Sequence, residues 1–150
     1  MGNHRRFGFE LLTRNTPSLV DFSFLALRLT IGGILLTIGA GKVLGWFGGM
    51  GLQATIQMFT TKIGIPAPLA YLSCFTEFLG GLCLAAGFLT RPAALAVAVN
   101  MTVATFVMLP RGFLFGGAAY PFTLLVIALV LLIAGPMGYS VDALLARPGK

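Results

Sequence analysis

Four long runs of apolar residues follow one another along this chain of 150 residues. They cover about 22–47, 69–89, 92–109 and 118–134. A helix needs about 20 residues to cross a hydrocarbon layer about 30 Å thick, and each run approaches or exceeds that length. No run shows the strict alternation of apolar and polar residues that is typical of a barrel strand. Apart from a closed barrel, only a helix forms all of its backbone hydrogen bonds within the membrane. The pattern therefore predicts an all-α integral membrane protein, a bundle of four transmembrane helices.

The connector between the first two runs has a different periodicity. Its apolar residues Leu52, Ile56, Phe59 and Ile63 recur at i, i+4, i+7 and i+11, which is one face of a helix. The glutamines and threonines of this stretch fall largely off that face. We expect a short amphipathic helix that lies on the membrane interface or caps the bundle, with a plain loop as the alternative.

Small residues predict close contacts between helices. Gly41 and Gly45 are four positions apart, as are Ala94 and Ala98. Such spacing allows helix backbones to approach closely in lipid.

Composition agrees with a membrane protein. Apolar residues make up 57% of the chain and charged residues only 9%, whereas a soluble domain has about 25% charged residues. The net charge of +6 comes from basic residues scattered along the chain. Charges that flank membrane spans account for this scatter better than a nucleic-acid interface does. The expected partner is the lipid bilayer, and nucleic acid is not expected.

The basic residues also predict the orientation. If the N-terminus is cytoplasmic, six Lys and Arg residues lie on the cytoplasmic side, namely Arg5, Arg6, Arg14, Arg91, Arg147 and Lys150. Three lie on the other side or at its interface: Lys42, Lys62 and Arg111. The positive-inside rule then places both termini in the cytoplasm. We expect a cytoplasmic tail over 1–21, a membrane domain over 22–145 and a second cytoplasmic tail over 146–150.

The chain has few groups that could perform redox or metal chemistry. Cys74 and Cys83 are nine positions apart in one run, too far along a straight helix to form a disulfide. The one histidine, His4, lies in the N-terminal tail, so no metal site is expected. No intrinsic cofactor is expected either, and an external cofactor or a partner subunit is the expected source of redox capacity.

Charged residues inside the apolar runs are the strongest functional signal, because each costs about 2.5–3.5 kcal/mol at the centre of a span. With a rise of about 1.5 Å per residue, Arg28 lies about 8 Å from the cytoplasmic surface, Glu77 about 18 Å and Lys42 about 28 Å. Glu77 is thus roughly midway between two basic groups whose long side chains could approach it.

Three interpretations of Glu77 remain open. It is an ion-pair partner that locks two helices together, part of a polar site for a ligand or a proton, or a protonated carboxyl group that is hydrogen-bonded. Asn100 in the third run either bonds to a neighbouring helix or belongs to the same site. Arg91 follows the second run and either anchors the topology or takes part in the site. The candidate polar site or intramembrane charge network therefore contains Glu77, Lys42, Arg28, Asn100 and Arg91, with no assigned catalytic role.

These positions occur in an ordered pattern that resembles the DoxX family of small four-helix membrane proteins. The matching residues are Arg28-Leu29, Gly32-Gly33, Gly39, Lys42, Glu77, Gly80-Gly81, the Gly87-Phe88-Leu89-Thr90-Arg91-Pro92-Ala93-Ala94 stretch and the Gly135-Pro136-Met137-Gly138-Tyr139-Ser140-Val141-Asp142 ending. Met137 replaces a common glycine of the ending.

The resemblance implies a protein of the bacterial inner membrane near quinone or sulfur redox chemistry. The implied function is a redox-associated subunit that interacts with quinone or with a partner oxidoreductase. An accessory, non-catalytic subunit fits this as well as an enzyme does. The alternative is a structural or assembly subunit of a larger membrane complex with no chemistry of its own.

Overall fold

The computed structural model describes residues 17–146, so most of the two expected tails lies outside the described residues. Within that range the chain is helical. The elements are α2 (Pro17–Leu44), η1 (Trp46–Gly48), α3 (Leu52–Met58), η2 (Phe59–Ile63), α4 (Ala67–Ala86), α5 (Thr90–Met108), η3 (Leu109–Arg111), α6 (Ala119–Ala134) and α7 (Val141–Leu145). The prediction of an all-α membrane protein is confirmed, since three helical segments are long and apolar enough to span a membrane.

The fourth predicted span is shorter than the other three. Helix α6 has 16 residues, which corresponds to about 24 Å. A hydrocarbon core is about 30 Å thick, so α6 is an apolar helix below the usual length of a span. The count of four membrane-crossing helices therefore remains a prediction.

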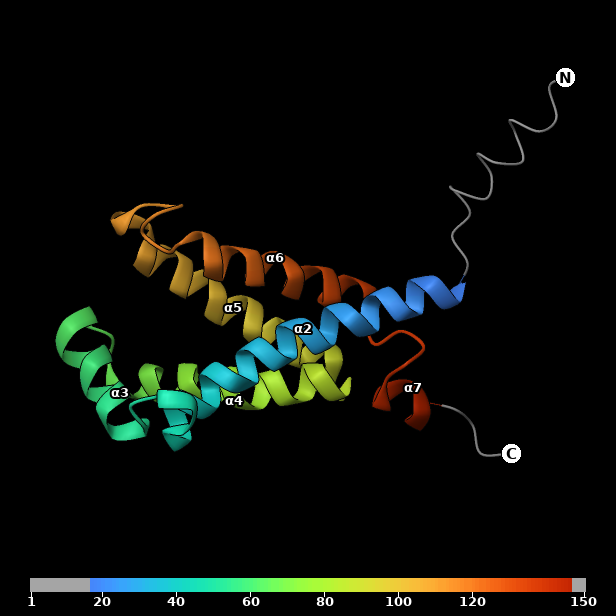
Figure 1. Cartoon of the computed structure of the whole chain (residues 1–150), viewed down its shortest axis with the longest axis horizontal. Helices are drawn as coiled ribbons and strands as arrows, with labels where there is room; N and C mark the ends of the chain where they lie inside the picture. Colours follow the sequence, from blue (N-terminus) through green and yellow to red (C-terminus); the bar gives the residue numbers. More distant parts are fainter. Residues whose placement is uncertain (1–16, 147–150) are drawn as a thin grey trace, which may run out of the picture.

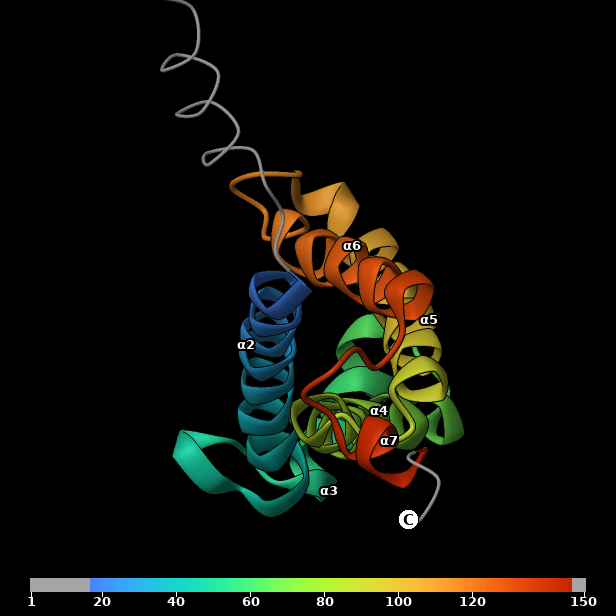
Figure 2. The same ribbon diagram turned by 90° about the vertical axis from the view of Figure 1, so that its right-hand side faces the viewer.

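The long helices form two antiparallel pairs, α2 with α4 and α5 with α6 (Figures 1 and 2). Glycines bring the first pair together. A Cβ atom on Gly32 would lie 2.5 Å from the backbone nitrogen of Ala85, and one on Gly81 would lie 2.5 Å from that of Leu36. Any side chain at these two positions would collide with the other helix, so only glycine allows the two backbones to lie this close.

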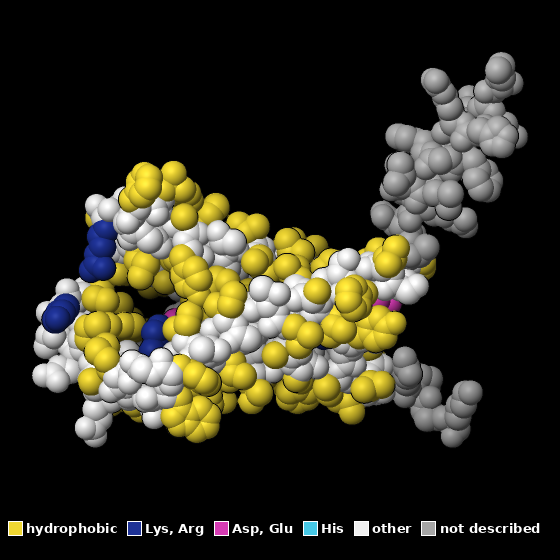
Figure 3. All heavy atoms as spheres, in the orientation of Figure 1, with side chains coloured by type: hydrophobic (Ala, Val, Ile, Leu, Met, Phe, Trp, Pro, Cys, Tyr) yellow, Lys and Arg dark blue, Asp and Glu magenta, His cyan; other side chains and the backbone are white. Residues whose placement is uncertain are grey.

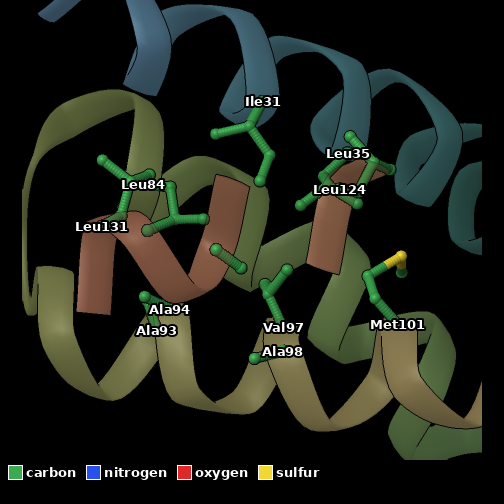
Figure 4. Packing of buried hydrophobic residues seen from close by; sticks show 11 residues of the cluster. Ile31, Leu35, Leu84, Ala93, Ala94, Val97, Ala98, Met101, Leu124 and Leu131 are labelled. Carbon is green, nitrogen blue, oxygen red and sulfur yellow. The ribbon is translucent and has the colours of Figure 1, made fainter. Parts of the chain in front are cut away.

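A hydrophobic core joins the two pairs (Figure 4). Ile31 and Leu35 from α2 meet Leu84 from α4, together with side chains from α5 and α6. Ala94 and Ala98, the alanine pair expected to make close contacts, are buried in this core. The glycine pair behaves differently, because a Cβ atom on Gly41 would meet the η1 loop rather than another membrane-spanning helix.

The predicted amphipathic helix is present as α3 and its continuation η2. Ile56 and Phe59 are buried, whereas Gln53 and Gln57 are exposed, as the periodicity indicates. The buried face packs in a second cluster with Ala70 and Cys74 of α4 and partly buried residues of α2. The plain-loop alternative is thus wrong, and the location of this helix at a membrane interface stays a prediction.

The C-terminal segment 135–145, called the strap below, crosses one end of the bundle and contains α7 (Figure 1). We call this the strap end and the opposite end the α3 end.

Candidate functional site

The five candidate residues separate into two groups in the structure. Lys42, Glu77 and Asn100 meet in the part of the bundle toward the α3 end. Arg28 and Arg91 lie against the strap. The sequence places Glu77 midway between Arg28 and Lys42, but only Lys42 contacts it.

Glu77 is held by side chains from two other helices. The Nζ atom of Lys42 lies 2.6 Å from Oε2 of Glu77 and 2.8 Å from Oε1. The Nδ2 atom of Asn100 donates to Oε1 over 3.5 Å, a long hydrogen bond. The side chain of Glu77 is 7% exposed and that of Lys42 is 26% exposed. The carboxylate is therefore enclosed, while part of the lysine side chain remains accessible.

Helix geometry explains why Lys42 reaches Glu77. Side chains of a helix tilt toward its N-terminus. Lys42 is in the last turn of α2, so its side chain extends back along the helix toward the level of Glu77. The depth estimate from the sequence counted the rise between Cα atoms and left out the length and direction of this side chain.

Aromatic and polar groups from further elements surround the ion pair. The Nζ atom of Lys42 lies 5.4 Å from the centre of the Phe59 ring in η2, a cation–π distance. Tyr120 of α6 and Cys74 of α4 lie within electrostatic reach of Glu77. The carboxylate of Glu77 therefore contacts side chains of α2 and α5, and Phe59 of η2 lies beside its lysine partner.

A cavity of about 390 Å³ opens beside Lys42. Its walls come from the end of α2, the η1 loop and α3, and they are Thr37, Ile38, Gly41, Lys42, Trp46, Phe47, Gly48, Gly49, Met50, Thr55 and Met58. Lys42 is the only charged residue of this lining. The cavity thus combines mostly apolar walls with one ammonium group.

The second group fixes the strap to the bundle. Arg28 is 1% exposed, and its Nη2 atom donates to the backbone carbonyl of Tyr139. Gly87, in the turn between α4 and α5, leaves the space that this guanidinium occupies, since a Cβ atom there would collide with Nη1 of Arg28. The buried Arg28 therefore holds the strap from inside.

Asp142 of the strap caps the start of α5. Its carboxylate accepts hydrogen bonds from the backbone nitrogens of Leu89 (2.8 Å) and Thr90 (2.9 Å) and from the Thr90 hydroxyl (2.8 Å). Burial alone would raise the pKa of Asp142, but the bonds from Thr90 and Leu89 and the charge of Arg28 lower it below its ordinary value. Asp142 is therefore held ionised as a helix cap.

Arg91 does not reach the ion pair. A Cβ atom on Gly135 would lie 3.1 Å from its Nε atom, which places Arg91 against the start of the strap. Within residues 17–146 no three His, Cys, Asp or Glu side chains gather where they could hold a metal ion.

The sequence patterns missed Phe59, Tyr120 and Asp142 as neighbours of the charged residues. Phe59 is part of the apolar face of the amphipathic stretch, and Tyr120 begins the fourth apolar run. Asp142 is the only acidic residue after Glu77 and lies within the closing motif, which was an available signal.

Comparison with known proteins gives matches over most of the chain. The DoxX family model matches residues 23–110. Inner membrane protein YqjF of Escherichia coli (strain K12) is 33% identical over 133 residues, which cover 86% of this chain and 96% of that protein. "Putative oxidoreductase CatD" of Bacillus subtilis (strain 168) is 26% identical over 130 residues, 87% of this chain and 92% of that protein. No solved structure matches the chain.

Proposed function

This chain belongs to the DoxX family of membrane proteins, and on that premise we propose that it is an accessory subunit of a membrane oxidoreductase and binds quinone beside Lys42. One observation carries the proposal. The ammonium group of Lys42 is paired with a nearly buried carboxylate, and the same residue lines an open cavity. Lys42 can thus bind a ligand while it stays paired with Glu77.

The cavity suits a quinone in size and chemistry. Ligand pockets are usually about 300–1,000 Å³, apolar, with a few polar groups that fix the ligand, and this cavity has about 390 Å³. Trp46, Met50 and Met58 offer apolar surface for a ring. A quinone carbonyl oxygen can accept a hydrogen bond from Lys42, while Glu77 keeps the ammonium in place. The electrons would come from a partner protein, since a bound quinone needs a reductant.

The relatives support the setting of this proposal. One relative is named as an inner membrane protein, and another is named "Putative oxidoreductase CatD". We extend both to this chain, as a protein of the bacterial inner membrane with its two termini in the cytoplasm and with other membrane or redox subunits as partners.

A structural or assembly subunit is the second candidate function. The observation that favours it is that the Lys42–Glu77 pair joins α2 to α4 at a contact already made close by glycines such as Gly32 and Gly81. An ion pair that only locks these helices would need no ligand.

A measurement of quinone binding to the full chain, purified in mild detergent, distinguishes the quinone-binding function from the structural one. Trp46 is the only tryptophan and lines the cavity, so its fluorescence reports directly on occupancy. We expect saturable quenching by a short-chain quinone, and a loss of affinity of about tenfold or more in Lys42→Met, as for the removal of one charged hydrogen bond. Arg91→Gln removes a charge at the strap end and is the matched control.

Two outcomes would contradict quinone binding. One is quenching that never saturates in the wild type, together with the absence of quinone from the purified protein. The other is equal affinity in Lys42→Met and the wild type. Co-purification of a membrane partner that is lost in Lys42→Met would then favour the assembly function.

A further inference from the structure

The α3 end of the bundle is open where the two helix pairs separate. The space-filling view shows a hollow between the α3 side and the side of α5 and α6, with basic side chains on both sides of it (Figure 3). The cluster of Ile56, Phe59, Ala70 and Cys74 fixes α3 and η2 to the α2–α4 pair. The strap is hydrogen-bonded across the opposite end of the bundle.

The crevice carries an excess of positive charge. The described basic residues at this end are Lys42, Lys62 in η2 and Arg111 in η3, because Arg28 and Arg91 lie with the strap. Glu77 is the only carboxylate at this end among residues 17–146, since Asp21 and Asp142 bind the strap and its surroundings.

The ion pair with Lys42 uses that carboxylate. Lys62 and Arg111 are both exposed. Their two positive charges therefore remain available to an anion.

The surroundings of Arg111 are apolar. Among the residues next to it, Leu109 is 44% exposed, Leu114 is 70% exposed and Phe115 is fully exposed. A small free anion would leave this apolar surface in contact with water. A molecule with an anionic head and an apolar tail would contact both the charges and the apolar side chains.

We infer that the crevice binds a phospholipid through the phosphate of its headgroup, with Lys62 on one side and Arg111 on the other. Arg111 offers the planar donor pair that binds phosphate oxygens, and Lys62 adds a point charge. The acyl chains extend along Leu109, Leu114 and Phe115. Lys62 and Arg111 do not line the cavity beside Lys42, so this inference does not depend on quinone binding.

The length of α5 agrees with this placement. The helix has 19 residues, about 28 Å, which nearly equals the thickness of a hydrocarbon core. When Thr90 lies at one boundary of the hydrocarbon, Arg111 lies just past the other boundary, at the level of the phosphates. Lipid phosphates at this depth are therefore within reach of the crevice.

The test uses the full chain in nanodiscs that contain equal amounts of phosphatidylglycerol and phosphatidylcholine, and it counts by native mass spectrometry the lipids that stay on the protein after its release. An anionic lipid gains about 1 kcal/mol per basic residue near it, which corresponds to about 30-fold for two. We expect phosphatidylglycerol to be retained about 30-fold more often than phosphatidylcholine.

The double variant Lys62→Gln/Arg111→Gln should reduce the preference to near unity. The charge-preserving variant Lys62→Arg/Arg111→Lys should keep most of it, and circular dichroism checks that both are folded. Equal retention of the two lipids by the wild type would overturn the inference, as would an unchanged preference in the glutamine variant. Displacement of the lipid by inorganic phosphate alone would show that the crevice takes a free anion instead.

Discussion

The Lys42–Glu77 pair gives the sharpest prediction about the stability of the bundle. At an effective dielectric constant of about 20, two unit charges 4 Å apart attract by about 4 kcal/mol. The two groups here are 2.6 Å apart, but Lys42 is 26% exposed, which weakens the attraction. We therefore expect a coupling free energy of about 2–3 kcal/mol between them, near the upper end for neighbouring residues.

The two single variants should differ in their cost. Lys42→Met leaves a carboxylate that is 7% exposed with only Asn100 as a partner, so we expect a loss of about 3–5 kcal/mol. Glu77→Gln leaves an ammonium group that can turn toward the cavity, so the loss should be about 1–2 kcal/mol. Lys62→Met removes an exposed lysine and should change stability by no more than about 0.5 kcal/mol.

The assay is a double-mutant cycle on the free energy of unfolding of the purified protein, followed by circular dichroism. The double variant Lys42→Met/Glu77→Gln contains no charge at the site, so it should be more stable than Lys42→Met alone by about 1 kcal/mol, the coupling free energy less the cost of Glu77→Gln. If the losses of the two single variants simply add, within about 0.5 kcal/mol, the pair does not couple α2 to α4 and the reasoning fails.

The strap gives three further predictions. Gly87→Ala should lower the melting temperature strongly, because φ is +68° and a Cβ atom there would meet Arg28, whereas Gly33→Ala, with nothing within 4 Å, should be neutral or stabilising. Thr90→Val should cost about 1 kcal/mol in unfolding experiments by removing the hydroxyl bond to Asp142. Because the pKa of Asp142 is lowered on folding, its contribution is complete above about pH 4 and is lost as the pH falls further. Asp142→Asn should therefore remove part of the acid dependence of the melting temperature, and an unchanged profile would contradict this role.

The helical framework could be predicted because apolar runs and their lengths are local properties of the sequence. The amphipathic face of Ile56 and Phe59 is local in the same sense, and its burial follows the predicted period. Gly41 and Gly45 show the limit of such patterns. Their spacing also fits a helix contact, but the chain leaves the helical path at Gly45, where φ is +74°. Gly41, in the last turn of α2, therefore packs against the loop that follows and not against another long helix.

The site could be predicted only in part, because a charge in an apolar run indicates a partner without identifying it. The sequence offered Arg28 and Lys42 as equal partners of Glu77. The choice depends on the register of α2 against α4, which is set by contacts such as that of Gly32 with Ala85. It also depends on the strap, because the backbone carbonyl of Tyr139 accepts a hydrogen bond from Arg28. Neither contact is visible in a single run of residues.

The separation of these two basic residues decides which of them a ligand could use. Arg28 is 1% exposed and bound to the strap, so a ligand could reach it only if the surrounding chain moved. Lys42 is paired with Glu77, yet it also lines a cavity. The same feature of the sequence, a basic residue in the first apolar run, thus has two physical consequences. At the strap end it closes the bundle, and toward the α3 end it leaves a charge that binding can exploit.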